Sequence, residues 1–317
     1  MGTRLRPHTY TIPKPLLPVA GKPIIDHILE PLAALEPEEV VFVVGHLGDQ
    51  IVDYVRKNFG FRSVFVRQTD LLGLGFAIHL ALEEMASSPV MVILGDTIAR
   101  TDYGRFADGE KNVIGLKQVD DPRRFGIAVI EDGRIVALEE KPERPRSDMA
   151  LIGLYFFEDS GELNGHLEKL IESGKKTSGE IQLTDALEMM IQAGHDFRPY
   201  LVDDWYDCGK KETILETNRL ILDESQEPVD WAGSEIIEPV AIAADAEVTD
   251  SVIGPHVSIS AGVRIKDSVV RDSIICAGAE IERCMLDQSI IGGGAVIREA
   301  RGILNIGDSS EITIHEK

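Results

Sequence analysis

Two cations near the start of the chain stand in a segment with the composition of a phosphate-binding loop. Residues 1–24 read MGTRLRPHTYTIPKPLLPVAGKPI, with Arg4 directly after Gly2 and Thr3, and Lys14 between two prolines. Proline fixes φ and lacks an N–H donor, so we expect an extended, stiff loop here and no helix. A guanidinium, an ammonium and glycine N–H groups together suit the oxygens of a polyphosphate. The alternative is a surface loop that is basic by chance.

Composition excludes several classes of partner. The chain has 317 residues, 44% of them hydrophobic, which is enough for one large domain or two ordinary ones. Its formal charge of −22 argues against nucleic acid and anionic membranes, because their phosphates would be repelled. We see neither an apolar run long enough to span a membrane nor a signal peptide. The three cysteines lack metal-like spacing, which indicates reduced thiols and a cytoplasmic protein.

Short apolar strands alternate with amphipathic helices in the first hundred residues. Strands are predicted at 40–44 and 90–94, and helices at 23–35, 50–58 and 76–85. This alternation indicates a parallel sheet covered on both faces. Ligands of such sheets gather at the carboxyl ends of the strands, so the loops after each strand are candidate sites.

Two of these loops carry residues suited to nucleotide chemistry. Gln68 precedes Gly73 in QTDLLGLG, where an amide could pair with a nucleobase edge and glycine could admit a flat ring. Asp96 follows the strand VMVIL and could hold Mg²⁺ together with phosphate oxygens and water. The alternative for Asp96 is a turn or helix cap.

Several motifs, taken in order, resemble those of the sugar-1-phosphate nucleotidylyltransferases. They are GTRLRP at 2–7, PKPLLPV at 13–19, GKPI at 21–24, QTDLLGL at 68–74, LGD at 94–96, FG at 125–126, EEKP at 139–142, GEIQLTD at 179–185 and WYDCG at 205–209. The overall similarity is closest to the long-form glucose-1-phosphate thymidylyltransferase branch of that family.

The resemblance implies a role for each matching residue. Arg4 and Lys14 would grip a nucleoside triphosphate, and Lys141 would place the phosphate of a sugar 1-phosphate. Nucleotide contacts fall on Gly2, Thr3, Gln68 and Gly73. Sugar contacts fall on Gly126, Glu140, Leu151 and Glu180. The expected cofactor is Mg²⁺, with Asp96 and Asp207 as its ligands.

The last part of the chain has a different period. Ile242, Ile259, Ile275 and Ile291 are spaced by 17, 16 and 16 residues, and further aliphatic residues recur every five or six positions between them. This is the pattern of hexapeptide repeats in a left-handed parallel β-helix. Because His256 is the one histidine in the regular coils, and fits a turn, we interpret the tail as an oligomerisation or packing element.

We therefore predict an α/β protein with a Rossmann-like mixed-sheet nucleotidyltransferase domain at 1–223, a linker at 224–238 and a left-handed β-helix at 239–317. The expected reaction joins a nucleoside triphosphate and a sugar 1-phosphate into a nucleotide sugar and pyrophosphate, with dTTP and glucose 1-phosphate as the first choice. Alternatives are UDP-glucose, GDP-mannose or ADP-glucose pyrophosphorylase, a non-catalytic regulatory relative, or a hexapeptide acyltransferase. A cytoplasmic homo-oligomer is expected.

One departure from the family pattern concerns the start of the chain. The signature normally follows a β-strand and a Gly-Gly pair, whereas Met1 stands at the x of G-G-x-G-T-R. A parallel sheet that lacked this strand would leave backbone groups of its neighbours unpaired. We therefore expect the natural chain to begin upstream, and the chain as given to bind and turn over nucleotide poorly.

Overall fold

The chain divides into two compact units, each described here by itself. The computed structural model describes residues 3–108, 111–224 and 231–314, so Gly2 and part of the predicted linker at 224–238 lie outside the described residues. A central unit comprises Leu29–Trp205, and an N/C unit combines Met1–Ile28 with Tyr206–Lys317. The opening loop thus clusters with the C-terminal repeats, a grouping that the motifs did not indicate.

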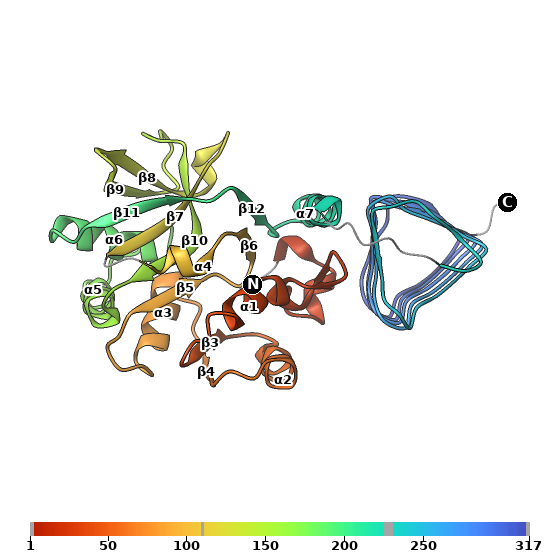
Figure 1. Cartoon of the computed structure of the whole chain (residues 1–317), viewed down its shortest axis with the longest axis horizontal. Helices are drawn as coiled ribbons and strands as arrows, with labels where there is room; N and C mark the ends of the chain where they lie inside the picture. The colour runs from red at the N-terminus through yellow and green to blue at the C-terminus, as the bar shows by residue number, and fades with distance from the viewer. Residues whose placement is uncertain (1–2, 109–110, 225–230, 315–317) are drawn as a thin grey trace. The chain divides into compact units, whose positions relative to one another are not determined.

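The central unit is built on a mixed, six-stranded sheet (Figure 1). Its order is β11-β7-β10-β8-β9, and β5 also pairs with β10. The strands are β5 (Val90–Ile93), β7 (Asn112–Gln118), β8 (Gly126–Glu131), β9 (Arg134–Glu140), β10 (Met149–Phe157) and β11 (Phe197–Leu201). β10 runs antiparallel to β5, β7 and β8, while β11 runs parallel to β7. A mixed sheet is therefore confirmed, although the alternation of strands and helices alone indicated a parallel one.

The other elements of the central unit follow the predicted order. Strands β3 (Val40–Val44) and β4 (Ser63–Arg67) form a separate parallel pair, and β6 covers Thr97–Arg100. The helices are α1 (Ile24–Ala33), which crosses the boundary between units, α2 (Gly48–Asn58), α3 (Leu74–Leu82), α4 (Tyr103–Phe106), η4 (Pro122–Arg124), α5 (Ser160–Glu172) and α6 (Leu183–Gln192). None of the helices in the described residues has the length and apolar character needed to cross a membrane.

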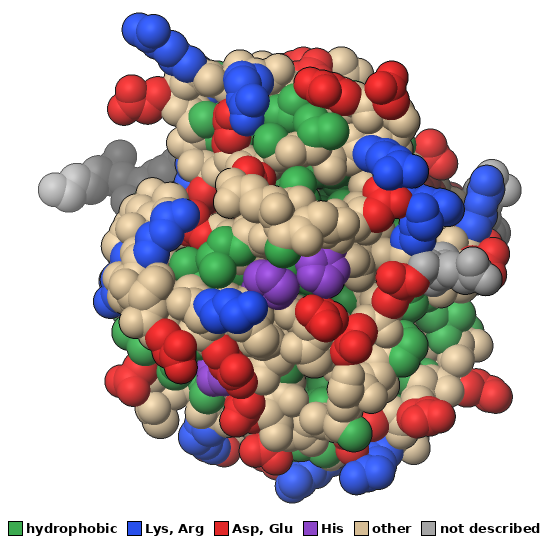
Figure 2. Space-filling model, turned by 90° about the vertical axis from the view of Figure 1, so that its left-hand side faces the viewer, with side chains coloured by type: hydrophobic (Ala, Val, Ile, Leu, Met, Phe, Trp, Pro, Cys, Tyr) green, Lys and Arg blue, Asp and Glu red, His purple; other side chains and the backbone are tan. Residues whose placement is uncertain are grey.

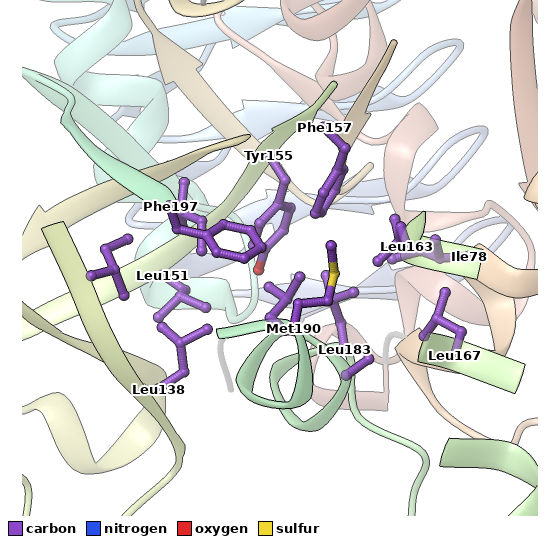
Figure 3. Close-up of a cluster of buried hydrophobic side chains, with 14 of the residues drawn as sticks. Ile78, Leu138, Leu151, Tyr155, Phe157, Leu163, Leu167, Leu183, Met190 and Phe197 are labelled. Carbon is purple, nitrogen blue, oxygen red and sulfur yellow. The ribbon is translucent and has the colours of Figure 1, made fainter. Parts of the chain in front are cut away.

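One face of the sheet packs on α3, α5 and α6 through a buried apolar cluster (Figure 3). Phe157 and Phe197 come from the strands, and their rings meet edge to face at 6.4 Å between centroids. Leu163 from α5 and Met190 from α6 complete the contact from the helix side. The sequence MALIGLYFF of β10 is buried along nearly its whole length, as a continuous apolar strand inside a sheet should be.

Asp132-Gly133, a dipeptide typical of a hairpin turn, joins β8 and β9. Both turn residues have positive φ, +48° and +75°, which is the geometry of a type I′ hairpin turn. The register shifts by one residue between Val129 and Ile130, and beyond this shift Gly126 pairs with Glu140 across the two strands. The turn and the shift together place two residues of the predicted sugar site opposite each other.

The opening loop of the N/C unit is not extended, and that prediction was wrong. It folds into three single 3₁₀ turns and a small antiparallel pair, namely η1 (Thr3–Leu5), η2 (His8–Tyr10), η3 (Lys14–Leu16), β1 (Pro18–Val19) and β2 (Lys22–Pro23). Proline is compatible with the first positions of such a turn, because the N–H groups there have no partner within the turn. In η3 the turn closes through the N–H of Leu17, which donates to the carbonyl of Lys14 at 3.0 Å.

The C-terminal repeats form a left-handed β-helix whose coils trace a triangle in Figure 1. Three parallel sheets of five strands each make its sides. The first contains β13 (Glu235–Ile236), β16 (Val252–Ile253), β19 (Val269–Arg271), β22 (Met285–Asp287) and β25 (Arg301–Gly302). The second contains β14 (Val240–Ile242), β17 (Val257–Ile259), β20 (Ile274–Ile275), β23 (Ile290–Ile291) and β26 (Asn305–Ile306). The third contains β15 (Glu247–Thr249), β18 (Arg264–Lys266), β21 (Glu280–Glu282), β24 (Val296–Arg298) and β27 (Glu311–Thr313).

The β-helix buries residues on its inward side and on one outer face as well. Ile259, Ile275 and Ile291 form the inner ladder, in register from coil to coil. On the outer face of the second sheet, Ile274 and Ile290 are also buried. They line a small cavity shared with Leu5, His8, Leu17, Pro18 and Ile214. The opening loop and α7 (Lys211–Glu224) therefore cover this face.

Candidate functional site

The predicted sugar site converges on one carboxylate in the central unit. Glu140 ends β9, and its side chain is only 10% exposed. The hydroxyl of Thr184 donates to Oε2 of Glu140 at 2.7 Å, and Nζ of Lys141 lies 3.1 Å from Oε1. A buried carboxylate requires such partners to stay charged. Glu140 and Lys141 thus form a fixed acceptor beside a cation, which suits a sugar hydroxyl next to a phosphate.

Close packing around Glu140 requires a glycine at position 126. A Cβ at Gly126 would lie 3.1 Å from Oε2 of Glu140 and 3.2 Å from Oγ1 of Thr184. The same Cβ would lie 3.6 Å from Cδ2 of Leu151, so the Leu151 side chain also lies close to Gly126. Burial, together with the negative charge of Glu140, raises the pKa of Tyr155 well above its ordinary value, so this phenol stays protonated.

Lys141 occupies an unusual backbone conformation. Its φ is +42°, in the left-handed region that side chains other than glycine rarely adopt. The N–H of Lys141 donates to the carbonyl of Phe125 at 3.0 Å, which holds the end of β9 beside the start of β8. The side chain is half exposed and therefore accessible to an anionic ligand. Strained residues of this kind cluster at ligand sites, which agrees with the role expected for Lys141.

A second pair of predicted residues is also brought together. Gly73 has a φ of +116°, and a Cβ there would lie 2.5 Å from the carbonyl oxygen of Ile181. The N–H of Ile181 donates to the carbonyl of Leu72 at 2.7 Å, so the two loops are joined through their backbones. This contact places Gly73, expected at the nucleotide, next to Glu180, expected at the sugar.

Gln68 and the two predicted metal ligands each lie at or just after the end of a strand. Gln68 comes directly after β4, and its N–H donates to the carbonyl of Val44 at 2.8 Å. Asp96 is exposed between β5 and β6, and it accepts a hydrogen bond from the hydroxyl of Thr97 at 3.2 Å. Asp207 ends β12 (Asp204–Asp207) in the N/C unit, and a Cβ at Gly209 would approach its Oδ1 to 2.8 Å.

The loop that carries Arg4 and Lys14 is fastened to the last coils of the β-helix. Nε2 of His8 donates to Oδ1 of Asn305 at 2.8 Å, because the amide nitrogen of Asn305 points to the carbonyl of Arg6. The hydroxyl of Thr11 donates to Oδ2 of Asp308 at 2.6 Å. Thr3 and Arg4 belong to η1, immediately before these anchor points.

A buried amide fastens the other end of this loop. Oδ1 of Asn218 in α7 accepts from the N–H of Ala20 at 2.9 Å and from the hydroxyl of Ser258 at 2.6 Å. Its Nδ2 donates to the carbonyl of His256 at 3.1 Å. Asn218 therefore links the opening loop, α7 and the β-helix through one side chain.

Three residues of this arrangement were not singled out from the sequence. Thr184 has the local context of a helix cap, but α6 begins at Leu183 with Gln182 as its N-cap, and the Thr184 hydroxyl donates to Glu140. His8 and Asn218 carry no motif signal, because their partners lie about 300 and 40 residues away in the chain.

The residues that were set aside as structural behave as such. Cys208 is fully buried in the N/C unit. Burial raises the pKa of the Cys276 thiol to about 12, which keeps it in the unreactive protonated form. His256 lies in a turn of the β-helix, as expected, and its Nε2 is 2.7 Å from Oδ1 of Asp223.

Comparison with known proteins agrees with this geometry. The nucleotidyl transferase family matches residues 1–224, and the GlmU-like, C-terminal hexapeptide family matches residues 218–301. The chain therefore belongs to the nucleotidyl transferase family. It is an enzyme of the sugar-1-phosphate nucleotidyltransferase type, with a C-terminal hexapeptide β-helix.

Individual relatives are similar over most or all of the chain. A glucose-1-phosphate thymidylyltransferase of Streptomyces griseus is 31% identical, covering 99% of this chain and 97% of the relative. A bifunctional protein GlmU of Methanocaldococcus jannaschii is 34% identical over 76% of this chain and 59% of its own length. Among solved structures, a putative glucose-1-phosphate thymidylyltransferase from Bacillus anthracis, in complex with a sucrose, has a TM-score of 0.60 at 27% identity, covering 69% of this chain and 90% of its own. A UDP-glucose pyrophosphorylase complexed with UDP-glucose has a TM-score of 0.61 at 25% identity, covering 71% and 95%.

Replacing Gly73 by alanine tests the contact between the two loops of the central unit. Gly73→Ala should lower the free energy of unfolding by roughly 1–3 kcal/mol, because the new Cβ meets backbone atoms and φ is positive. Gly165→Ala in α5 is the matched control, since nothing lies within 4 Å of its added Cβ. Urea denaturation measures both, and equal stability of Gly73→Ala and the parent chain would contradict this contact.

The anchoring of the opening loop by His8 should depend on pH. Burial lowers its pKa below the ordinary 6.5, and the bond to Asn305 and the charge of Asp308 offset this only in part. The unfolded chain therefore takes up a proton at a higher pH than the folded chain does. The contribution of His8 to the free energy of unfolding is retained above about pH 6.5 and is lost as the pH falls below that value. Unfolding curves at pH 7.5 and 5.5 should show a larger loss for the parent chain than for His8→Gln, and identical losses would refute this assignment.

Proposed function

We propose that this protein transfers a nucleotidyl group from dTTP to glucose 1-phosphate, giving dTDP-glucose and pyrophosphate. The observation that carries the proposal is the arrangement around Glu140. The 10% exposed carboxylate of Glu140 accepts from Thr184 against the bare backbone of Gly126, and Lys141 lies next to it. Such a site can take a sugar hydroxyl and the neighbouring phosphate together.

The chemistry requires alignment and charge neutralisation more than proton transfer. An oxygen of the sugar phosphate is already ionised, so it can attack the α-phosphorus without a general base. The new P–O bond forms as the bond to the bridging oxygen of the β-phosphate breaks, and pyrophosphate leaves with its electron pair. Lys141 would hold the attacking phosphate in line, while Arg4 and Lys14 would neutralise the triphosphate.

Other residues are assigned to recognition. Gln68 would pair with an edge of the base, and the absence of a side chain at Gly73 would let the ring approach the backbone. The N–H groups of Gly2 and Thr3 would contact phosphate oxygens. Glu180, whose Oε2 accepts from Nε2 of Gln182 at 3.2 Å, would share sugar hydroxyls with Glu140.

We assign Mg²⁺ as the cofactor, with Asp96 and Asp207 as its protein ligands. Carboxylate oxygens are the donors that Mg²⁺ prefers, and exposure of Asp96 leaves room for phosphate oxygens and water in the remaining positions. When bound, the cation would supply charge stabilisation at the phosphates of the nucleotide.

The choice of dTTP and glucose 1-phosphate rests on the relatives. The thymidylyltransferase of Streptomyces griseus matches the chain from end to end, including the repeats. UTP is the second candidate base donor, because a UDP-glucose pyrophosphorylase shares the fold of the catalytic part at 25% identity.

Release of pyrophosphate from pairs of substrates tests the proposal. Full-length protein with Mg²⁺ should release pyrophosphate fastest from dTTP with glucose 1-phosphate, among four triphosphates and a panel of sugar 1-phosphates. Asp96→Asn should reduce the rate at least a hundredfold, about 2.7 kcal/mol of transition-state stabilisation, because a ligand of the cation loses its charge. Asp132→Asn, in the hairpin turn, is the matched control and should keep full activity. Absence of pyrophosphate release from every pair would refute the proposal. Faster release with UTP than with dTTP would make UTP the assigned nucleotide donor.

A further inference from the structure

Three side chains of types that can ligate a metal lie together in the central unit. The proposed reaction gives these residues no role. Glu162 and His166 belong to α5, and His195 belongs to the turn between α6 and β11. One potential ligand atom from each lies within 4.8 Å of the others. Figure 2 looks onto the side that carries α5 and α6, where two histidine side chains lie next to each other with acidic side chains close by.

The backbone fixes all three positions. Glu162 and His166 are four residues apart on one helix, so their side chains share a face. His195 follows a Schellman motif at the end of α6, in which Gly194 has a φ of +95°. The N–H of His195 donates to the carbonyl of Met190, and that of Gly194 to the carbonyl of Ile191, both at 3.0 Å. The histidine is thus held by a capped helix end and not by a free loop.

A hydrogen bond of His166 fixes the tautomer of its ring. Nδ1 of His166 lies 2.8 Å from the backbone carbonyl of Glu162, which can only accept, so Nδ1 carries the proton. In the neutral ring Nε2 is then the unprotonated atom with a lone pair. Metal-bound histidines characteristically use their second nitrogen in this way.

The distances are close to those of a coordinated cation. Nε2 of His195 lies 3.7 Å from Oε2 of Glu162, and the two imidazole rings meet edge to face at 5.4 Å between centroids. Tetrahedral zinc, with bonds of about 2.0–2.1 Å, needs its ligand atoms about 3.4 Å apart. Side-chain rotations that move the ligand atoms by about one ångström would bring them to the separation that zinc requires. His166 is buried while Glu162 is exposed, so a cation could enter from the carboxylate side.

We propose that Glu162, His166 and His195 bind one divalent cation of the Zn²⁺ type, which ties α5 to the end of α6. Two imidazoles with one carboxylate favour Zn²⁺, Ni²⁺ or Co²⁺ over Mg²⁺, which prefers oxygen ligands. The site is therefore chemically distinct from the all-carboxylate Mg²⁺ site assigned above. The negative charge of the chain also favours uptake of cations.

A second cluster of the same residue types is already joined by hydrogen bonds to a side-chain amide. His79, Glu83 and Glu168 also lie within 4.8 Å of one another. There, however, the amide of Asn164 donates to Glu83 at 3.0 Å and to Glu168 at 3.2 Å, while its oxygen is 2.8 Å from Nδ1 of His79. Because the amide already satisfies these groups, this cluster serves as the control.

Zinc binding by the full-length protein tests the proposal. Protein freed of metal with a chelator is titrated with Zn²⁺ against a chromophoric competitor, with excess Mg²⁺ present to occupy carboxylate sites. One Zn²⁺ should bind per chain, and Co²⁺ should give the strong visible absorption of a tetrahedral site with nitrogen ligands. His195→Ala and Glu162→Gln should each weaken Zn²⁺ binding at least tenfold, whereas His79→Ala should leave it unchanged.

Both substituted ligands are partly exposed, so these variants are expected to fold. Thermal unfolding with and without Zn²⁺ provides a second readout, since a cation that binds only the folded chain raises Tm. The rise in Tm should occur in the parent chain and in His79→Ala and be absent in His195→Ala. No stoichiometric binding to the parent chain, equal binding by His195→Ala, or loss of binding in His79→Ala would overturn the proposal.

Discussion

The opening loop of this enzyme depends on one buried amide. Asn218 is 1% exposed, and its side chain makes three hydrogen bonds to three separate partners: the backbone of Ala20, the hydroxyl of Ser258 and the carbonyl of His256. Loss of such a residue would leave buried donors and acceptors without partners, at a cost of about 1–3 kcal/mol for each group. The loop that carries Arg4 and Lys14 is therefore part of the same folded unit as the β-helix.

The repeats therefore help to hold the opening loop of the same chain, whatever their part in assembly between chains. The second sheet of the β-helix buries Ile274 and Ile290 on its outer face, where a free-standing coil would expose them. Gly21 and Gly307 permit close approach, since a Cβ at either position would lie 2.9 Å from a carbon of Ala241 or Pro7 respectively. The sugar-side residues are positioned differently, by a hairpin and a helix start within the central unit.

The motifs in the sequence predicted the order of elements and the β-helix, because these depend on local period and turn chemistry. The mixed sheet was predicted through the family resemblance, since the local pattern alone indicated a parallel one. Asp132-Gly133 and the aliphatic ladder are examples in which neighbouring residues determine the structure. The opening loop was predicted wrongly because proline is compatible with short 3₁₀ turns as well as with extended backbone.

The remaining differences come from contacts between residues far apart in the chain. Thr184 has the local context of a helix cap, whereas its hydroxyl donates to Glu140 on another element. His8 and Asn218 are positioned by coils that follow them by many residues. The placement of Glu140 beside Gly126 was predicted only through the family resemblance, since the sequence Glu-Glu-Lys alone is typical of a solvated surface.

Hydrogen exchange at the amide of Ala20 tests most directly whether the Asn218 side chain holds the opening loop. In the parent chain this N–H donates to Asn218 at 2.9 Å and should exchange slowly. In Asn218→Ala, the amides of Leu17 and Ala20 should exchange at least tenfold faster, while those of β10 keep their protection. Unchanged exchange at Ala20 in Asn218→Ala would contradict this dependence, because the loop would then hold its conformation without the Asn218 side chain.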